Sequence, residues 1–285
     1  MAGTKRSWEG LPLRDDPKSQ IPTNTMAEPA THILSMFGTF RDELDGHHDR
    51  RERLIKTSRD ITALSKKIIF SLQRVRATNT PIPPSIAKET QSRFTQILEL
   101  FRAVVPDVKG LNSWRYLRQL SPGIQEFIEA FSFHHYLQTQ TVITLEQVSG
   151  YLPREILVTD EDYMMGLFDL TGEIMRFAVT SLSAGGHTSS TDAETESELG
   201  LRNLPRLPAS QAGVVRDLRE MRAQFESLSI PRRHNMLRDF GKKEDVMQTS
   251  VEKVERAAYG ILVRGSERPA GWAPDLSAPI ETEIY

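Results

Sequence analysis

A heptad repeat of apolar residues most limits what this chain can fold into. Leu54, Ile61, Ile68 and Val75 lie seven positions apart. This spacing predicts a long helix that packs nearly parallel or antiparallel to its neighbours. The prolines of the segment NTPIPPS end that helix, because proline interrupts helical hydrogen bonding. No stretch of useful length alternates apolar and polar residues as a strand does, so the sequence predicts an all-α protein.

Helices are also expected on both sides of this segment. Residues 33–44 carry apolar side chains at helical spacing and predict a helix that ends before Gly46. Ser85 is suited to cap a third helix, which runs to the neighbourhood of Pro106. A fourth, long helix is expected over about residues 109–138.

The second half of the chain continues this pattern. Pro122 and Gly123 mark an expected kink or break in the fourth helix. Thr144 and Gln147 have the spacing of a capping box and predict a short helix. The acids of the segment TDEDY complement the N-terminus of the next helix, and two more helices are expected after residue 210.

These segments together predict a single-domain antiparallel bundle of about seven helices. The bundle is expected over residues 30–260, with a flexible insertion loop at 184–210 that is rich in glycine, serine, threonine and acids. Residues 1–29 and 261–285 contain scattered prolines among polar residues and are expected to be flexible tails.

Composition excludes several classes of protein. The net charge of −2 argues against a protein that coats nucleic acid with bulk positive charge. With no cysteine, the chain has no disulfide, zinc-thiolate site or thiol nucleophile, which suits a reducing compartment, and we expect a cytoplasmic and nuclear protein. No apolar run reaches membrane-spanning length, so no membrane partner is expected.

Two pairs of acids on different predicted helices suggest a chemistry. Glu126 and Glu129 are three residues apart, and Asp169 and Glu173 are four apart, so each pair projects from one side of its helix. Two packed helices would therefore bring four carboxylates together. Because Mg²⁺ prefers oxygen ligands and is commonly held between carboxylates and a phosphate, the first hypothesis is metal-assisted phosphodiester cleavage.

Each acid also has a simpler interpretation. Most helical acids are solvated surface residues, but the residues around Asp169 and Glu173 leave almost no polar face. Arg176, three residues after Glu173, would neutralise that acid and leave Asp169 in need of another partner. Apolar residues also continue the glutamate side of the other helix at Phe133 and Tyr136, which indicates an assembly interface or an enclosed cavity.

The segment WRYLR mixes aromatic and cationic groups. Trp114, Arg115 and Arg118 could stack on unpaired bases and pair with phosphates, or Trp114 could belong to the core. The helix from Arg50 to Arg76 carries many further cations, for which a solvated face with ordinary ion pairs is the simpler interpretation. A diiron bundle is not favoured, because the chain contains no Glu-x-x-His.

Three segments carry a resemblance to a known family. They read FRDELDGHHDRRERLIKTSRDITALSKKIIFSLQR, LSPGIQEFIEAFSFHHYL and DYMMGLFDLTGEIMRFAV. They resemble the translin superfamily, roughly over residues 33–182 and more loosely to about 260. The resemblance implies an all-α bundle that joins a translin homologue in a hollow, barrel-like hetero-oligomer, which binds single-stranded RNA or DNA. It also implies that this type of subunit is the catalytic one, a Mg²⁺-dependent endoribonuclease for passenger strands of small RNAs and for tRNA-processing fragments.

The resemblance also assigns residues. The family's acidic cluster, which is both metal-binding and catalytic, falls on Glu126, Glu129, Asp169 and Glu173. The WRYLR segment lies where translin-type chains have a basic nucleic-acid-binding stretch. Two alternatives stay open: a non-catalytic subunit that binds single-stranded nucleic acid, and a helical scaffold for protein partners.

Overall fold

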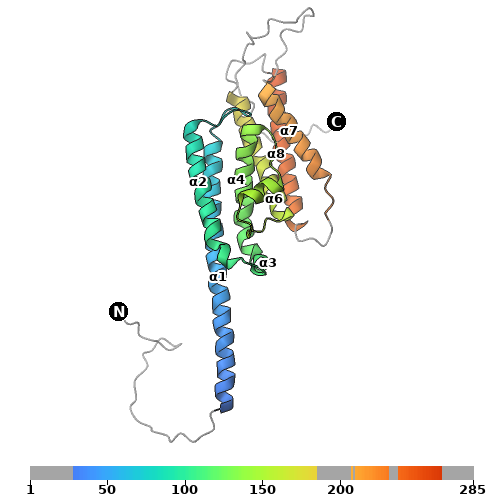
Figure 1. Ribbon diagram of the computed structural model, residues 1–285. Helices are drawn as coiled ribbons and strands as arrows, with labels where there is room; N and C mark the ends of the chain where they lie inside the picture. Colours follow the sequence, from blue (N-terminus) through green and yellow to red (C-terminus); the bar gives the residue numbers. More distant parts are fainter. Residues whose placement is uncertain (1–27, 185–206, 208, 231–236, 265–285) are drawn as a thin grey trace, which may run out of the picture. The chain divides into compact units, whose positions relative to one another are not determined.

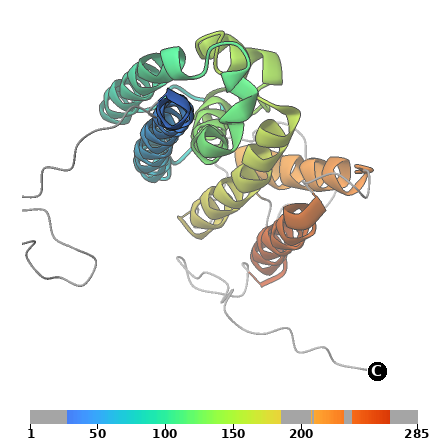
Figure 2. The same cartoon turned by 90° about the horizontal axis from the view of Figure 1, so that it is seen from below.

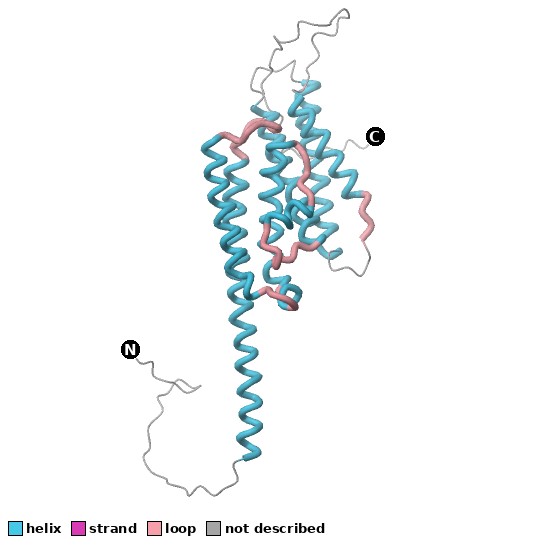
Figure 3. Tube along the Cα trace, viewed as in Figure 1, coloured by secondary structure: helices cyan, strands magenta, loops and turns pink. Residues whose placement is uncertain are grey.

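The computed structural model describes residues 28–184, 207, 209–230 and 237–264. All regular structure in this part of the chain is helical, which confirms the expected all-α class (Figures 1 and 3). The elements are α1 (Glu28–Leu72), α2 (Pro84–Val104), η1 (Val105–Asp107), α3 (Asn112–Arg115), α4 (Leu117–Thr139), α5 (Leu145–Tyr151), α6 (Asp160–Ala184), α7 (Ala209–Glu226) and α8 (Leu237–Arg264).

The chain divides into two compact units, residues 1–48 and residues 49–285. In the first unit the described residues belong to α1, and their large apolar side chains are exposed: Ile33, Leu34, Met36, Phe37, Phe40 and Leu44. The helix break expected before Gly46 is wrong, because α1 includes this glycine. One glycine inside a helix costs only about 1 kcal/mol relative to alanine, and a long helix tolerates that cost.

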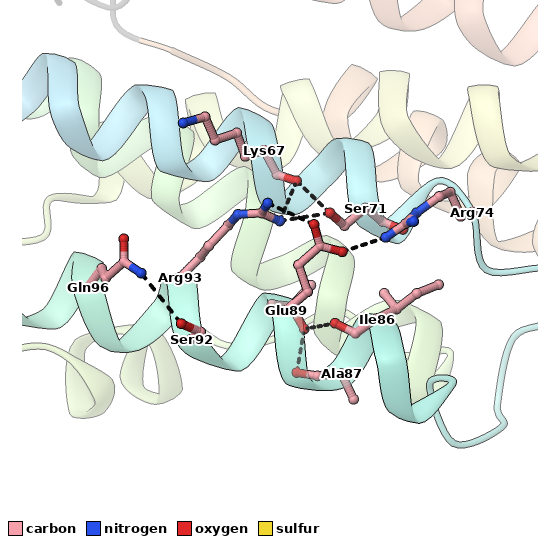
Figure 4. A network of polar contacts seen from close by, with 10 residues as sticks. Lys67, Ser71, Arg74, Ile86, Ala87, Glu89, Ser92, Arg93 and Gln96 are labelled. Carbon is pink, nitrogen blue, oxygen red and sulfur yellow. Dashed lines mark hydrogen bonds and ion pairs between the residues drawn. The ribbon is translucent and has the colours of Figure 1, made fainter.

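The second unit contains the heptad side chains and the core. Leu54, Ile61 and Ile68 are fully buried, as the heptad pattern predicts. Helices α1 and α2 lie side by side and share a polar network, shown in Figure 4. In it, Arg93 Nη1 donates to Ser71 Oγ over 2.8 Å. Helices α1 and α2 bury their apolar faces and join their polar side chains in this network, so together they form one wall of the bundle.

Two expected helix boundaries differ from the structure. Ser85 does not cap α2, since the helix already begins at Pro84, a residue whose fixed φ suits the first helical position. The fourth expected helix breaks at Tyr116, between α3 and α4, and continues through Pro122. Gly123 serves packing here: a Cβ at this position would lie 2.9 Å from the Ser58 carbonyl oxygen, so glycine permits α1 and α4 to approach closely.

Helices α4 and α6 run in the same direction, because α5 and the segments on both sides of it return the chain before α6 begins (Figure 3). Near the start of both helices, Gln125 Nε2 donates to Asp162 Oδ1 over 2.9 Å. Gly166 permits the close contact, since a Cβ there would lie 2.6 Å from Ile128 Cγ2. The Thr144 and Gln147 capping box of α5 is confirmed, with both of its hydrogen bonds present.

Helix α6 covers the glutamate side of α4. Phe133 and Tyr136 are therefore buried inside this chain, and the expectation that they line an assembly interface or cavity is wrong. Tyr136 Oη donates to Asp217 Oδ2 on α7 over 2.9 Å. Sequence periodicity showed that this side was apolar, but it could not show which helix covers it.

Helices α7 and α8 pack on the other side of α6 (Figure 2). Phe168 stacks on Phe225 with ring centroids 4.1 Å apart and meets the edge of Phe240 at 5.3 Å. The expected 184–210 loop and both expected tails lie mostly outside the described residues, although α1 begins at Glu28 and α8 extends to Arg264. Within the described chain, no helix is long and apolar enough to cross a membrane.

Candidate functional site

The four sequence-predicted acids come together between α4 and α6. The parallel direction of the two helices aligns Glu126 and Glu129 with Asp169 and Glu173. Their charges interact: Asp169, Glu173 and Glu126 each raise the pKa of Glu129. The register is maintained by Gly166, because a larger residue there would separate the helices.

Glu126 has one paired and one unpaired carboxylate oxygen. Lys66 Nζ on α1 lies 3.2 Å from Glu126 Oε1. The other oxygen, Oε2, is buried and accepts no hydrogen bond from the described residues. A buried acceptor without a donor is uncommon in native proteins and calls for a missing partner.

Glu129 is buried, with only 9% of its surface exposed. No described residue donates a hydrogen bond to its carboxylate. Burial away from water and the charges of Asp169, Glu173 and Glu126 together raise its pKa to about 8, while Lys243 opposes the change. Glu129 is therefore protonated at neutral pH unless another cation approaches.

Asp169 pairs with Lys243 Nζ, which reaches it from α8. The two residues are 74 positions apart in the sequence, and both side chains are partly exposed. Sequence reasoning did not identify Lys243, because nothing in the charged pattern of α8 distinguishes a lysine that faces α6 from one that faces water. This contact supplies the partner that Asp169 was expected to need.

Glu173 is the best satisfied of the four. Arg176 Nη1 lies 2.8 Å from its Oε1, which confirms the expected intrahelical ion pair. Gln73 Nε2, in the turn directly after α1, donates to Oε2 over 2.8 Å. Burial still raises the pKa of Glu173, with Asp169 and Glu126 contributing in the same direction and Arg176 and Gln73 opposing it.

The carboxylate oxygens are ligands that a hard divalent cation prefers, but their arrangement in the structure is not that of a metal site. Four carboxylates face three cations, Lys66, Arg176 and Lys243, so full ionisation leaves one negative charge without a counter-ion. Among the described residues, none donates a hydrogen bond to Glu126 Oε2 or to the Glu129 carboxyl. However, no three His, Asp or Glu side chains in the described chain are arranged to hold a metal ion. Metal binding here would require the acidic side chains to move and Lys66 and Lys243 to release the carboxylates with which they pair.

The WRYLR segment lies away from these acids. Trp114 is 64% exposed in the short helix α3, so it is not a core residue. Arg115 and Arg118 are exposed as well. Arg118 precedes Glu126 by eight residues, which is about 12 Å along the axis of α4. The structure thus leaves these groups accessible and does not add them to the acid cluster.

Much of the basic face of α1 is already neutralised. Asp107 accepts hydrogen bonds from Arg53 Nη2 at 2.8 Å and from Arg50 Nε at 3.3 Å. At the other end, Glu89 pairs with Arg74 and Arg93, as Figure 4 shows. These contacts fit the simpler interpretation of that face, an ordinary set of ion pairs. Lys66 differs from them because its partner belongs to the acid cluster.

Comparison with known proteins finds relatives over most of this chain. The pattern of the Translin family matches residues 49–265. Translin-associated protein X from Rattus norvegicus is 28% identical over 94% of this chain and 91% of its own length. The Translin-associated protein X homolog of Schizosaccharomyces pombe is 28% identical over 81% of this chain and 89% of its own. Translin from Mus musculus is 21% identical over 82% and 94%.

Two solved structures share the fold. The crystal structure of apo-NeC3PO matches with a TM-score of 0.56 and 16% identity, over 77% of this chain and 94% of its own. The crystal structure of AfC3PO matches with a TM-score of 0.51 and 19% identity, over 78% and 94%. The helical arrangement is therefore common to these proteins.

Proposed function

Because the chain belongs to the translin family, we propose that it is the catalytic subunit of a translin-containing endoribonuclease. The complex requires Mg²⁺ and cleaves single-stranded RNA. The observation that carries this proposal is Glu129, a buried carboxyl with a pKa near 8 among three other acids. A strongly perturbed acid with no hydrogen-bond donor is typical of a functional site.

The four acids have distinct parts in this proposal. Glu126, Glu129, Asp169 and Glu173 would hold the metal, which when bound supplies a Lewis acid that activates water and offsets charge on the leaving oxygen. Gln73 and Arg176 keep the Glu173 carboxylate in one orientation. Before the metal binds, Glu129 carries a proton at neutral pH, so metal binding there would release that proton.

The partner in this proposal is a translin homologue. Translin-associated protein X and translin are both relatives of this chain, and a hetero-oligomer of the two types would enclose the acids. The exposed apolar side chains between Ile33 and Leu44 favour an assembled state, because such a stripe is costly in water. Substrates are small-RNA passenger strands or tRNA-processing fragments, with single-stranded DNA also bound, in the cytoplasm and the nucleus.

The test is cleavage of a labelled single-stranded RNA by the chain reconstituted with its translin homologue. We expect cleavage with Mg²⁺ and none with a chelator. Glu129→Gln should abolish cleavage, while the matched control Glu99→Gln, an exposed glutamate on α2, should cleave at the wild-type rate. Equal rates in both variants would remove Glu129 from the site.

A second candidate is a subunit that binds single-stranded nucleic acid without cutting it. It is favoured by the two lysines, Lys66 and Lys243, which already neutralise acids of the cluster, and by the lack of a ready metal arrangement in the described chain. Tight RNA binding by the complex, with no cleavage at any Mg²⁺ concentration, would establish this candidate. It would exclude the catalytic one.

A further inference from the structure

One exposed aromatic side chain lies between the two places where α1 contacts the acid cluster. Lys66 of α1 pairs with Glu126, and Gln73 donates to Glu173. Phe70 follows Lys66 by four residues and precedes Gln73 by three. Residues at this spacing share one helix face, so Phe70 projects from the face of α1 that borders the acids.

The exposure of Phe70 is unusual for its position. Its neighbours Ile68, Ile69 and Leu72 are buried, whereas Phe70 is 75% exposed. A phenylalanine ring left in water forgoes roughly 2 kcal/mol of burial free energy. Packing within the chain therefore does not account for an aromatic residue here.

We propose that Phe70 is a stacking platform for an unpaired base of the bound nucleic acid, next to the phosphate at the acid cluster. The inference rests on the proposed function for the position of that phosphate. An aromatic ring accepts any base, because every base has a π-face. Lys66 and Lys67, both exposed cations on the preceding turn, lie where the backbone phosphates of such a strand would pass.

This placement also determines the form of the substrate. A base can stack on Phe70 only after it has left its own helical stack, so a single strand binds at a lower unpairing and unstacking cost than a duplex. The ring selects for an unpaired nucleotide beside the cleaved bond and not for a sequence. Bases of all four types should bind with similar affinity.

The chain offers a matched control for this ring. Tyr259 on α8 is also an exposed aromatic residue, at 66%, and it follows Lys243 by 16 residues. That separation is about 24 Å along the helix axis, beyond the reach of a nucleotide held at the acids. Tyr259→Leu removes an exposed ring of similar size without touching the proposed platform.

The experiment uses the complex reconstituted with a translin homologue and a single-stranded RNA that carries one 2-aminopurine, with Ca²⁺ in place of Mg²⁺ to slow cleavage while a divalent cation still holds the phosphate at the acids. The fluorescence of 2-aminopurine falls when the base stacks. Across probes that carry the 2-aminopurine at different positions, wild type and Tyr259→Leu should quench the fluorescence at one of these positions. Phe70→Leu, which keeps an apolar side chain, should lose the quenching and bind about ten-fold more weakly, and Phe70→Trp should restore both.

The outcomes separate this inference from the proposed function. Wild-type quenching and affinity in Phe70→Leu would overturn the inference, while cleavage by the wild-type complex would still support the endoribonuclease. Quenching that depends on Phe70 in a complex that never cleaves would support the platform and reject the endoribonuclease. Failure of Phe70→Leu to assemble, seen by sedimentation, would place the ring in a subunit interface and overturn the inference.

Discussion

Two of the buried acids at the α4–α6 interface, Asp162 and Glu129, have contrasting surroundings. Asp162, at the start of α6, is 1% exposed and accepts hydrogen bonds from Ser121, Gln125 and Thr159. Glu129, farther along α4, is 9% exposed and has no such donors among the described residues. A buried carboxylate surrounded by donors stabilises a fold, whereas one without them destabilises it. The contrast indicates a structural role for Asp162 and a functional one for Glu129.

The largest expected effect is on catalysis at Glu129. Glu129→Gln keeps the shape of the side chain and removes its charge and its titration. We expect the cleavage rate of the complex to fall by about a thousand-fold, as when a group that stabilises a transition state is lost. Cleavage is measured on a labelled single-stranded RNA at saturating Mg²⁺, with Glu99→Gln as the control. Assembly and thermal stability should not fall. A cleavage rate within about two-fold of wild type would contradict the functional role assigned to Glu129.

The next effect is on stability at Asp162. Asp162→Ala removes the acceptor for Ser121, Gln125 and Thr159, and leaves only the hydrogen bond from Gln125 Nε2 to Ser121 Oγ within this group. We expect a loss of about 3 kcal/mol in the free energy of unfolding, measured by urea denaturation. The folded, assembled fraction should cleave RNA at the wild-type rate. An inactive but fully folded variant would instead place Asp162 in the site.

A smaller effect concerns pH. The folded-state pKa of Glu129 is about 8, against an unfolded value of 4.5. Between these values the folded state binds more protons than the unfolded state, so stability falls as pH rises from about 4.5 to about 8. Relative to Glu129→Gln, the wild type should lose about 2 kcal/mol between pH 6 and pH 8. Thermal denaturation of both proteins at each pH measures the difference, and parallel curves would contradict it.

Magnesium should oppose that loss. A divalent cation favours the ionised carboxylate, so it lowers the pKa of Glu129 and binds more tightly as pH rises. Mg²⁺ should therefore raise the melting temperature of the wild-type complex more at pH 8 than at pH 6. Glu129→Gln should show no such difference between the two pH values. An equal shift in wild type and variant would mean that Mg²⁺ binds elsewhere.

The smallest effect tests how far RNA extends along the interface. Arg115 and Arg118 lie near the start of α4, the end of this helix that contacts Asp162 of α6, whereas Glu129 lies farther along α4. If RNA passes over that end, alanine at both positions should flatten the dependence of log affinity on log salt by roughly one unit per lost phosphate contact. An unchanged slope in an assembled double variant would assign these arginines to the surface and confine RNA to the Glu129 end.

Local signals in the sequence predicted local features. The Thr144 and Gln147 capping box depends on groups three residues apart, and both of its hydrogen bonds formed as expected. The Glu173 and Arg176 ion pair is local in the same sense. Helix boundaries were less certain, since Pro122 was expected to mark a break that lies at Tyr116 instead. A proline weakens a helix, but packing of the residues around it decides whether the helix continues.

The sequence by itself determined that the chain is helical, that four acids project in pairs from two helices, and that one of those helices is buried. These properties follow from spacing along a single helix. Only the tertiary structure decided which helices touch: Gly166 brings α6 against α4, and Lys243 arrives from α8, 74 residues from Asp169. The lack of a donor to Glu129 likewise belongs to the packed chain. A pKa depends on every charge and dipole nearby, and those neighbours are set by contacts between distant segments that no local pattern encodes.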